Sequence, residues 1–359
     1  MIRIRPATLD DAAAIARLGE RNGGGAPDIA AWKARWTEYP FAARMANVPI
    51  GWVLESEQGE IVGTFGNVPL LYEFDGRPLI VAIAADWAVD PEYRSMSMKL
   101  LTAFFKQKDV DICINGSANP TVSKVLTVMK TSEIPEPEYK CPMFWAARPV
   151  VFAGAVLRRR EIPCATLLAW PAGTALYCWD RLRGAGRPRM SVPIHRAPVF
   201  DERFDAFWDR LRTGSSRLRA VRTAAVLDWR FGRGVRNGSV VILTAGAGHD
   251  ITGYAVLQRR PNPEQGFEVY DVADLQTLGD DVPAIQSLIA GAIRAAREDG
   301  VAAVKFLNGN RAKVGPARAL RPYTYSLGYN QLFYKVPEPG LAARVAPADV
   351  WDFAPFETY

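Results

Sequence analysis

The chain has 359 residues, of which 49% are hydrophobic and 23% are charged, and this composition excludes a mainly disordered protein. At about 150 residues per domain, the length favours two domains. Four cysteines without a C-x-x-C pair exclude a disulfide scaffold, and two histidines are too few for a multi-histidine metal site, so no metal is expected. The start, MIRIRPATLDD, has no apolar signal segment, and we therefore expect a reducing, cytoplasmic location.

Strand and helix signals alternate through residues 1–147. Ile2–Arg5 alternates apolar and basic residues and predicts a strand, after which Thr8 is a candidate N-cap for a helix. Later strands are expected at Gly51–Ser56, Ile61–Leu71, Leu79–Val89 and Val110–Asn115. One helix is expected to run through about Gln107 and another to follow Asn119, with Pro120 at its first position.

The same order of elements recurs in the second half, which indicates an internal duplication. Strands are expected at Val240–Ala245, Ile251–Arg259, Phe267–Leu275 and Val301–Leu307, with helices at Val282–Glu298 and Arg311–Leu320. We therefore divide the chain into an N-terminal domain (1–147), a helical connector (148–191), a C-terminal domain (192–336) and a proline-rich, aromatic tail (337–359). The tail is expected to lie over a domain instead of forming a third one.

Arginine is concentrated in the middle of the chain. Residues 158–236 hold seventeen arginines and seven acidic residues, which fits either an anionic partner or solvated helix faces. No aromatic-glycine RNA signature accompanies them, so nucleic acid is not expected as a partner. Ile162–Trp179 is eighteen residues without a charge, near the lower limit of a membrane span, but its prolines favour a buried or surface-lying helix pair. A weak contact of residues 158–196 with a membrane surface stays open.

The stretch Ala84–Leu101 carries the clearest signal for chemistry. A buried strand leads into a proline-containing turn, and Arg94 and small residues then begin an amphipathic helix. Backbone N–H groups at a helix N-terminus bind phosphate with the help of the helix dipole, and an arginine adds a charged donor. An ordinary strand–turn–helix with an exposed arginine would give the same pattern.

This stretch resembles the acyl-CoA-binding motif of the GNAT superfamily (GCN5-related N-acetyltransferases), which reads Arg or Gln, two residues, Gly, one residue, Gly or Ala. The opening IRIRPATLDDAAAIARL is similar to the first strand and helix of that family, and Asn115–Met129 resembles the turn and helix after its fifth strand. A weaker resemblance covers residues 192–336. The resemblance implies an α+β fold of two tandem GNAT-like domains, each a mixed, mostly antiparallel sheet flanked by helices.

The resemblance also implies acetyl-CoA, or another acyl-CoA, as the cofactor. The positions expected to bind its pyrophosphate are Arg94, Ser95, Met96, Ser97, Met98 and Lys99. The positions expected to hold the rest of the cofactor are Trp87, Ala88, Val89 and Asn119. Serines at positions 95 and 97 replace the usual glycines, and their side chains narrow the approach of the backbone to phosphate.

The family reaction is direct transfer of an acyl group from a thioester to an amine, which benefits from a base for the amine and a proton donor for the thiolate. Asp86 lies where relatives often place a carboxylate, in an apolar run that would strengthen it as a base, although a structural aspartate is an equal alternative. The helix after Asn119 has no tyrosine, which leaves Ser123 as a poor proton donor. Tyr93 or Tyr139 would reach the site only if their loops fold back.

The corresponding turn of the second half, Asp274–Asp281, differs in charge. It has no arginine, and it places two carboxylates where the pyrophosphate would lie. Like charges there oppose binding, so a cofactor is expected in the first half only.

Three functions stay open on the sequence. The first is an acyl-CoA-dependent N-acyltransferase, acetyl by preference, acting on an amine of a small molecule or amino sugar. The second is a peptidyltransferase that uses aminoacyl-tRNA on the same tandem fold, with the arginine-rich middle on RNA. The third is a non-catalytic binding protein on a GNAT scaffold, because both phosphate turns deviate from the family pattern.

Overall fold

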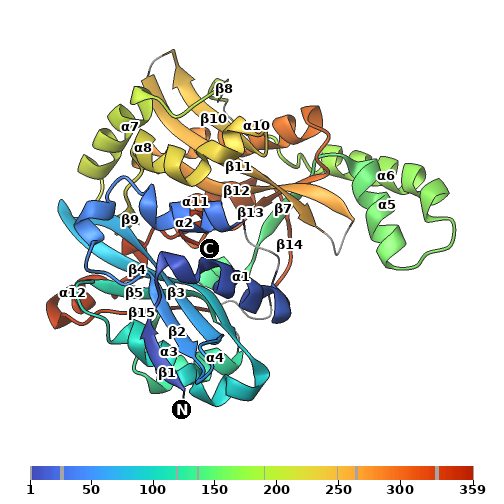
Figure 1. Cartoon of the computed structure of the whole chain (residues 1–359). Coiled ribbons are helices and arrows are strands. Elements are labelled where there is room, and N and C mark those ends of the chain that lie inside the picture. The colour runs from blue at the N-terminus through green and yellow to red at the C-terminus, as the bar shows by residue number, and fades with distance from the viewer. Residues whose placement is uncertain are drawn as a thin grey trace.

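The computed structural model describes residues 2–24, 28–118, 120–135, 137–189, 191–248, 250–262, 266–327 and 331–358. Within these ranges the chain forms two β-sheets, with helices packed on them (Figure 1). Both sheets are mixed and mostly antiparallel, which confirms the α+β fold class that the resemblance implied.

The first sheet is built around two long strands joined by a tight turn. Its strands in spatial order are β1 (Arg3–Pro6), β2 (Gly51–Glu55), β3 (Ile61–Phe74), β4 (Arg77–Val89), β5 (Ile112–Ala118), β15 (Gln331–Lys335) and β6 (Ser132–Glu133). The turn between β3 and β4 is Asp75-Gly76, whose φ angles of 50° and 72° are the left-handed pair that a two-residue hairpin needs. A short strand, β9 (Arg219–Ala220), also pairs with β3 and comes from the second half of the chain.

The second sheet repeats this plan. Its strands in spatial order are β14 (Tyr323–Thr324), β7 (Met143–Ala146), β13 (Ala303–Phe306), β12 (Phe267–Thr277), β11 (Asp250–Asn262), β10 (Val240–Ala247) and β8 (Ile194–Ala197). The parallel pair is β12 with β13, as it is β4 with β5 in the first sheet. The repeated order agrees with the duplication that the strand and helix signals indicated.

Apart from the short strand β9, the two halves of the chain exchange one strand each between the sheets. β7 lies in the first half of the sequence but pairs antiparallel with β13, and β15 lies in the second half but pairs antiparallel with β5. Each sheet is therefore completed by the other half of the chain, so a division of the sequence at residues 147 and 192 does not divide the sheets. The sequence signals did not reveal this exchange because pairing between distant segments leaves no local pattern.

Helices cover the sheets in matching positions. On the first sheet, α3 (Ser97–Phe105) and α4 (Pro120–Val128) pack on one face, and α1 (Ala12–Arg21) and α2 (Ile29–Thr37) pack on the other. On the second sheet, the outer face carries α10 (Val282–Glu298) and α11 (Arg311–Ala319), while the inner side carries α7 (Glu202–Thr213), α8 (Ala224–Leu227) and α9 (Arg233–Arg236). A hairpin of α5 (Pro149–Arg159) and α6 (Ala165–Leu182) projects from the body (Figure 1).

One hydrophobic core joins the two sheets. Ile114 of β5 and Val256 of β11 belong to the same buried cluster, and so do side chains of the tail after α12 (Pro339–Arg344). The tail contributes Trp351, Phe353 and Phe356, each no more than 2% exposed. The aromatic residues of the tail are thus part of the protein's central core.

Candidate active site

The parallel strands β4 and β5 separate partway along their length. They pair only from Val81 to Ile83 of β4 and from Ile112 to Ile114 of β5, while β4 continues to Val89. The rest of β5 pairs with β15 on its other side. Among the described residues, the last part of β4 therefore has a strand neighbour on the β3 side only. This places Trp87, Ala88 and Val89, three expected cofactor positions, on an open strand edge.

A β-bulge shapes this part of β4. Thr64 of β3 pairs with Ala88 and Gly66 pairs with Ala85, so the two residues between them on β4 face one residue on β3. Asp86, one of the two, has a φ of 45°, a left-handed conformation that is uncommon outside glycine. The absence of a side chain at Gly66 leaves room for this conformation of Asp86, because a Cβ on residue 66 would lie 3.0 Å from the carbonyl oxygen of Ala85.

Asp86 is held by two donors from α2. The indole Nε1 of Trp32 donates to Oδ2 of Asp86 at 2.8 Å, and the guanidinium of Arg35 donates to the same oxygen at 2.7 Å. The expectation that Asp86 lies in apolar surroundings is therefore wrong. The physical reason is that α2, more than fifty residues earlier in the chain, folds over the bulge and brings a cation to it.

The segment that forms α2 was not among the helices expected from the sequence. A signal was present: the side chain of Asp28 caps the helix by accepting from the backbone of Ala31, and Trp32 and Trp36 follow four residues apart on one face. The bulge itself has no signal of this kind, because it depends on how β3 and β4 pair.

A cavity of about 470 Å³ opens at the bulge. It is lined by Ile15 and Gly19 of α1, by Trp32 of α2 and by Asp86–Val89 of β4. A larger groove of about 850 Å³ lies on the other side of Trp32, between α2 and a π-helical turn, Asp228–Gly232. Trp229 of that turn donates through Nε1 to the backbone oxygen of Ala34 at 3.1 Å, so the second half of the chain holds α2 in place.

The turn after β4 is a short 3₁₀ helix, Pro91–Met96, which leads directly into α3. Its start is fixed by Arg21 of α1, whose side chain bonds both oxygens of Asp90 and lowers the pKa of that carboxyl. The backbone N–H of Ser97 donates to the oxygen of Arg94, so this amide already has a partner inside the turn.

The charged side chains of this turn point to solvent. Arg94 and Lys99 are exposed, and Arg94 forms no ion pair with any residue that the structure describes. Met98 is 42% exposed, because α3 buries Leu100, Leu101, Phe104 and Phe105 instead. Ser95 is also exposed, whereas Met96 is half-buried. The expected pyrophosphate positions thus form one accessible, positively charged surface at the end of β4.

Of the expected proton donors, Ser123 and Tyr139 are buried and Tyr93 is half-buried. Ser123 is a buried residue of α4, with its backbone oxygen accepting from the hydroxyl of Thr127 at 2.9 Å. Tyr139 is 2% exposed and belongs to the central core, where its ring contacts Phe353. Tyr93 is half-buried and packs on the cluster beneath α3. Asn119 lies outside the described residues.

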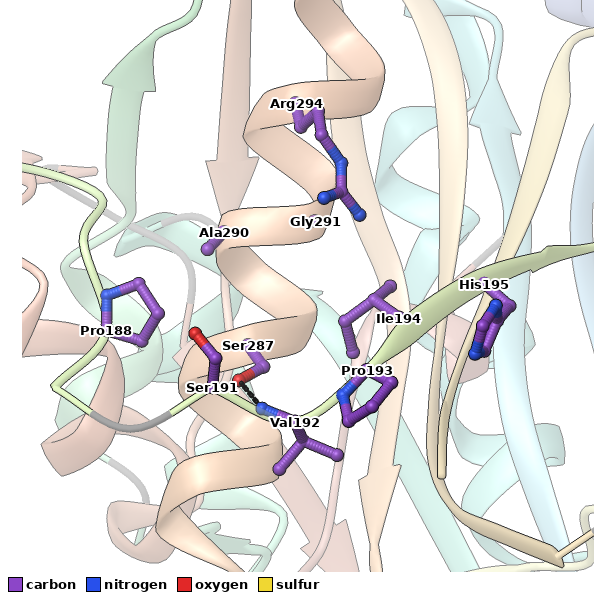
Figure 2. Close-up of a pocket in the computed structure, with 10 residues that line it drawn as sticks. All are labelled: Pro188, Ser191, Val192, Pro193, Ile194, His195, Ser287, Ala290, Gly291 and Arg294. Atoms are coloured by element: carbon purple, nitrogen blue, oxygen red, sulfur yellow. Dashed lines mark hydrogen bonds between the residues drawn. The ribbon is translucent and has the colours of Figure 1, made fainter. Parts of the chain in front are cut away.

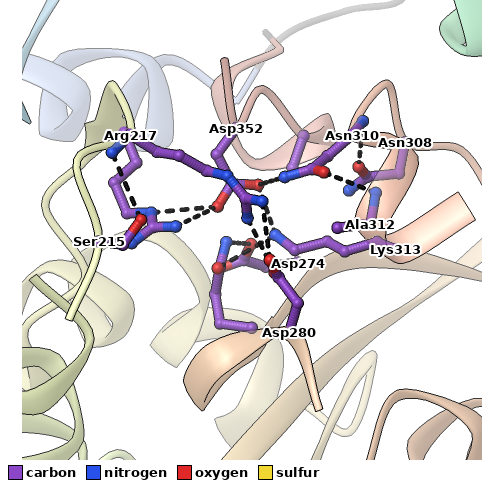
Figure 3. A network of polar contacts seen from close by, with 12 residues as sticks. Ser215, Arg217, Asp274, Asp280, Asn308, Asn310, Ala312, Lys313 and Asp352 are labelled. Carbon is purple, nitrogen blue, oxygen red and sulfur yellow. Dashed lines mark hydrogen bonds and ion pairs between the residues drawn. The ribbon is translucent and has the colours of Figure 1, made fainter. Parts of the chain in front are cut away.

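The equivalent cleft of the second half is filled by the chain itself (Figure 3). β12 pairs with β13 only as far as Val272 and then continues to Thr277. Beside this free part, the ammonium of Lys313 donates to the side chain of Gln276 at 3.0 Å and forms an ion pair with Asp352 of the tail. Arg219 pairs with the same carboxylate at 3.0 Å, and all of these side chains are buried.

The second turn is also closed to phosphate. Arg217 forms two parallel bonds to Asp280, of 2.8 and 2.7 Å, so this cation of the turn is already engaged (Figure 3). Of the two halves, the first therefore has the open cleft and the accessible cations.

Another cavity, of about 530 Å³, lies on the second sheet between the segment Ser191–His195 and α10 (Figure 2). The backbone N–H of Val192 donates there to the hydroxyl of Ser287 at 2.9 Å. None of its lining residues comes from the first sheet or its helices.

Among the described residues, no group of three or more His, Cys, Asp or Glu side chains is placed to hold a metal ion.

Solved structures with the same fold cover nearly the whole chain. A GCN5-related N-acetyltransferase from Anabaena variabilis aligns with a TM-score of 0.54 and 11% identity over 94% of this chain and 73% of its own. A protein of unknown function from Enterococcus faecalis, described as a probable N-acyltransferase, gives a TM-score of 0.57 at 11% identity over 94% and 73%. A GCN5-related N-acetyltransferase from Kribbella flavida gives 0.55 at 14% identity over 94% and 71%.

No protein-family model matches the sequence, and no curated protein matches it either. The structural likeness nevertheless extends over both sheets, since it covers 94% of the chain. It confirms the resemblance at the level of the fold: this chain has the fold of the GCN5-related N-acetyltransferases.

Proposed function

We propose that the protein is an acyl-CoA-dependent N-acyltransferase that transfers its acyl group directly to the amine of a small molecule, with acetyl-CoA as the first donor to test. One observation carries the proposal. β4 and β5 separate beyond Ile83 and Ile114, and this opening lies next to an accessible cationic turn, while the equivalent opening in the second half is filled by Lys313 and Asp352.

The residues of the first cleft fit such a cofactor. Backbone groups of Trp87 to Val89 that point away from β3 can pair with the amides of an extended pantetheine chain. Arg94 and Lys99 supply charge for the phosphates, and Arg94 has no competing ion pair among the described residues. When bound there, acyl-CoA would supply a thioester-activated acyl group. The serine side chains at 95 and 97 leave less room than glycines for phosphate to approach the backbone of the turn. Phosphate contacts from side chains are therefore favoured over contacts from backbone N–H groups.

The acceptor amine is assigned to the cavity at the bulge. Asp86 lines this cavity, and its Oδ2 takes the bonds from Trp32 and Arg35. Its Oδ1 accepts no hydrogen bond from a described residue, so this oxygen is available to an amine N–H. In the proposed reaction the amine nitrogen bonds to the acyl carbon and the carbon–sulfur bond breaks, so that CoA leaves as its thiolate and takes a proton from water. Oδ1 of Asp86 receives the proton that the amine loses.

The size of the cavity limits the acceptor. About 470 Å³ suits a small molecule such as an amino sugar, and Ile15 and Trp32 give the cavity apolar wall surface for its carbon skeleton. The adjoining groove lined by Arg35 and Arg233 gives the rest of a larger acceptor a polar surface.

The test is a transfer assay on the purified chain with acetyl-CoA and longer acyl-CoA thioesters against a panel of amino sugars and other primary amines. The proposal expects free CoA thiol and N-acylated amine in equal amounts, identified by mass spectrometry. Hydrolysis of the thioester without acylated amine, or no turnover with a donor that does bind, would overturn it.

A further inference from the structure

The α5–α6 hairpin exposes an unusual amount of apolar surface. It projects from the second sheet, away from both halves of the fold (Figure 1). Leu167, Trp170 and Leu182 of α6 are 75%, 70% and 83% exposed. Other large apolar side chains exposed on the same helix are Leu168, Tyr177 and Trp179. Solvent-exposed tryptophans and leucines gathered on one projecting element mark an interaction surface.

The packing of the hairpin explains this exposure. α6 contacts α5 through Ala165, Ala169 and Gly173, and a Cβ on Gly173 would lie 2.4 Å from the Cα of Val150. Because small residues occupy the contact, the large side chains of α6 point outward around the rest of the helix. A helix that is apolar around most of its circumference suits a non-aqueous environment.

Positive charge flanks the apolar surface. Residues 158–196 contain eight arginines and two acidic residues. This segment therefore has a net charge of +6, which equals the net charge of the whole chain. Arg158, Arg159 and Arg160 are exposed at the tip of the hairpin, where α5 ends. Arg181 is exposed near the other end of α6 and lies over the ring of Tyr177. Apolar and aromatic side chains between clusters of arginine are complementary to an anionic lipid surface.

The lengths of the helices decide how the hairpin would lie. α6 has 18 residues and is about 27 Å long, whereas α5 has 11 residues and is about 16 Å long, against a hydrocarbon core of about 30 Å. In the part of the chain that the structure describes, no helix is long and apolar enough to cross a membrane. When α6 lies along the membrane surface, the arginines at both of its ends reach the headgroups of the same leaflet.

We propose that the α5–α6 hairpin docks the protein on an anionic lipid bilayer, with Trp170 and Trp179 at the boundary between headgroups and acyl chains. Leu167 and Leu182 would enter the acyl region, and Arg158–Arg160 would contact the anionic headgroups. This inference is independent of the acyl-transfer proposal, because the hairpin contributes no residue to the cleft at β4.

Flotation of the full chain with phospholipid vesicles tests the docking. The proposal expects binding to an equal mixture of phosphatidylglycerol and phosphatidylcholine, at least about tenfold weaker binding to phosphatidylcholine alone, and loss of binding as salt rises from about 0.1 M to about 1 M. Replacing Trp170 and Trp179 together by serine should lower the vesicle-bound fraction at least about tenfold. The triple change Arg158→Gln, Arg159→Gln and Arg160→Gln should abolish the preference for the anionic vesicles.

The matched control is Val128→Ser, which removes an 82% exposed apolar side chain from α4 and should leave binding unchanged. Circular dichroism checks that each variant keeps its helix content. Failure of the wild type to float with anionic vesicles at low salt would overturn the proposal. So would self-association of the chain that the double tryptophan variant abolishes without any vesicle binding, since a second copy would then cover the hairpin.

Discussion

Lys313 of α11 and Asp352 of the tail form a buried ion pair inside the cleft of the second sheet. Their side chains are no more than 1% exposed, and Arg219 bonds the same carboxylate. The tail thereby occupies in the second half the space that stays open in the first. The two halves share one plan, and this contact explains why they differ in what they can bind.

Removing the Asp352 charge should destabilise the whole fold. Asp352→Asn leaves Lys313 and Arg219 buried without their carboxylate, and breaking one partner of a buried ion pair costs about 3–5 kcal/mol. Urea unfolding measures the loss of the free energy of unfolding. The control is Asp349→Asn, an exposed aspartate three residues earlier, which should change it by less than about 0.5 kcal/mol. Equal stability of the two variants would contradict the role given to the tail.

The carboxylate of Asp352 should also make the free energy of unfolding depend on pH in the acid range. Burial alone would raise the pKa of Asp352, but the charges of Lys313 and Arg219 outweigh burial and hold that pKa well below its ordinary value of 3.8. The unfolded chain therefore binds a proton near pH 4 that the folded chain does not, so the free energy of unfolding should fall as the pH drops below about 4, by up to about 1.4 kcal/mol per pH unit.

Comparison with Asp352→Asn isolates this contribution, because the variant should lack it. Burial raises the pKa of Glu357 from its ordinary 4.5. This shift makes the free energy of unfolding change with pH in the opposite direction. It is present in the wild type and in the variant, so it cancels when the two are compared. Parallel stability curves of the wild type and the variant between about pH 5 and pH 3 would rule out the assignment to Asp352.

A side chain at position 66 should strain the bulge of β4. A Cβ on Gly66 would lie 3.0 Å from the oxygen of Ala85 and 3.3 Å from the Cβ of Asp86, so Gly66→Ala has to displace the bulge. We expect a loss of about 1–3 kcal/mol in stability and at least about tenfold in kcat/KM. Gly315→Ala, on α11 with open space around it, is the matched control. Unchanged transfer by Gly66→Ala would mean that the bulge does not position the acceptor.

Asp86→Asn tests the proposed proton acceptor. Asparagine keeps an oxygen for the bonds from Trp32 and Arg35 but removes the negative charge, so the fold and CoA binding should persist. We expect kcat to fall by about a hundredfold, because a general base typically contributes about 10²–10⁴. Asp10→Asn, an exposed aspartate before α1, serves as the control. A rate within about twofold of wild type would assign Asp86 a structural role.

Local patterns in the sequence were sufficient for the order of the elements. The alternation in β1 and the apolar spacing in α3 each depend on neighbouring residues, and the structure has an element at both places. The overall GNAT plan followed from that order and is confirmed by the solved structures.

Contacts between segments far apart in the chain could not be predicted from local sequence patterns. The exchange of β7 and β15, the bonds from Arg35 to Asp86 and the insertion of Asp352 beside Lys313 all join segments far apart in the chain. For this reason the surroundings of Asp86 were predicted as apolar, whereas the structure gives it a cation. The open edge of β4 also depends on where pairing with β5 stops, which the strand signals do not contain.

The most direct test of the proposed cofactor site is calorimetric titration of the purified chain with acetyl-CoA and with free CoA, beside an Arg94→Glu variant. Glu92→Gln, a change in the same exposed turn that removes no positive charge, is the control. The account predicts micromolar binding by the wild type and the control, and its loss in Arg94→Glu. Absence of binding by the wild type, or equal affinity in Arg94→Glu, would contradict a cofactor site at the end of β4.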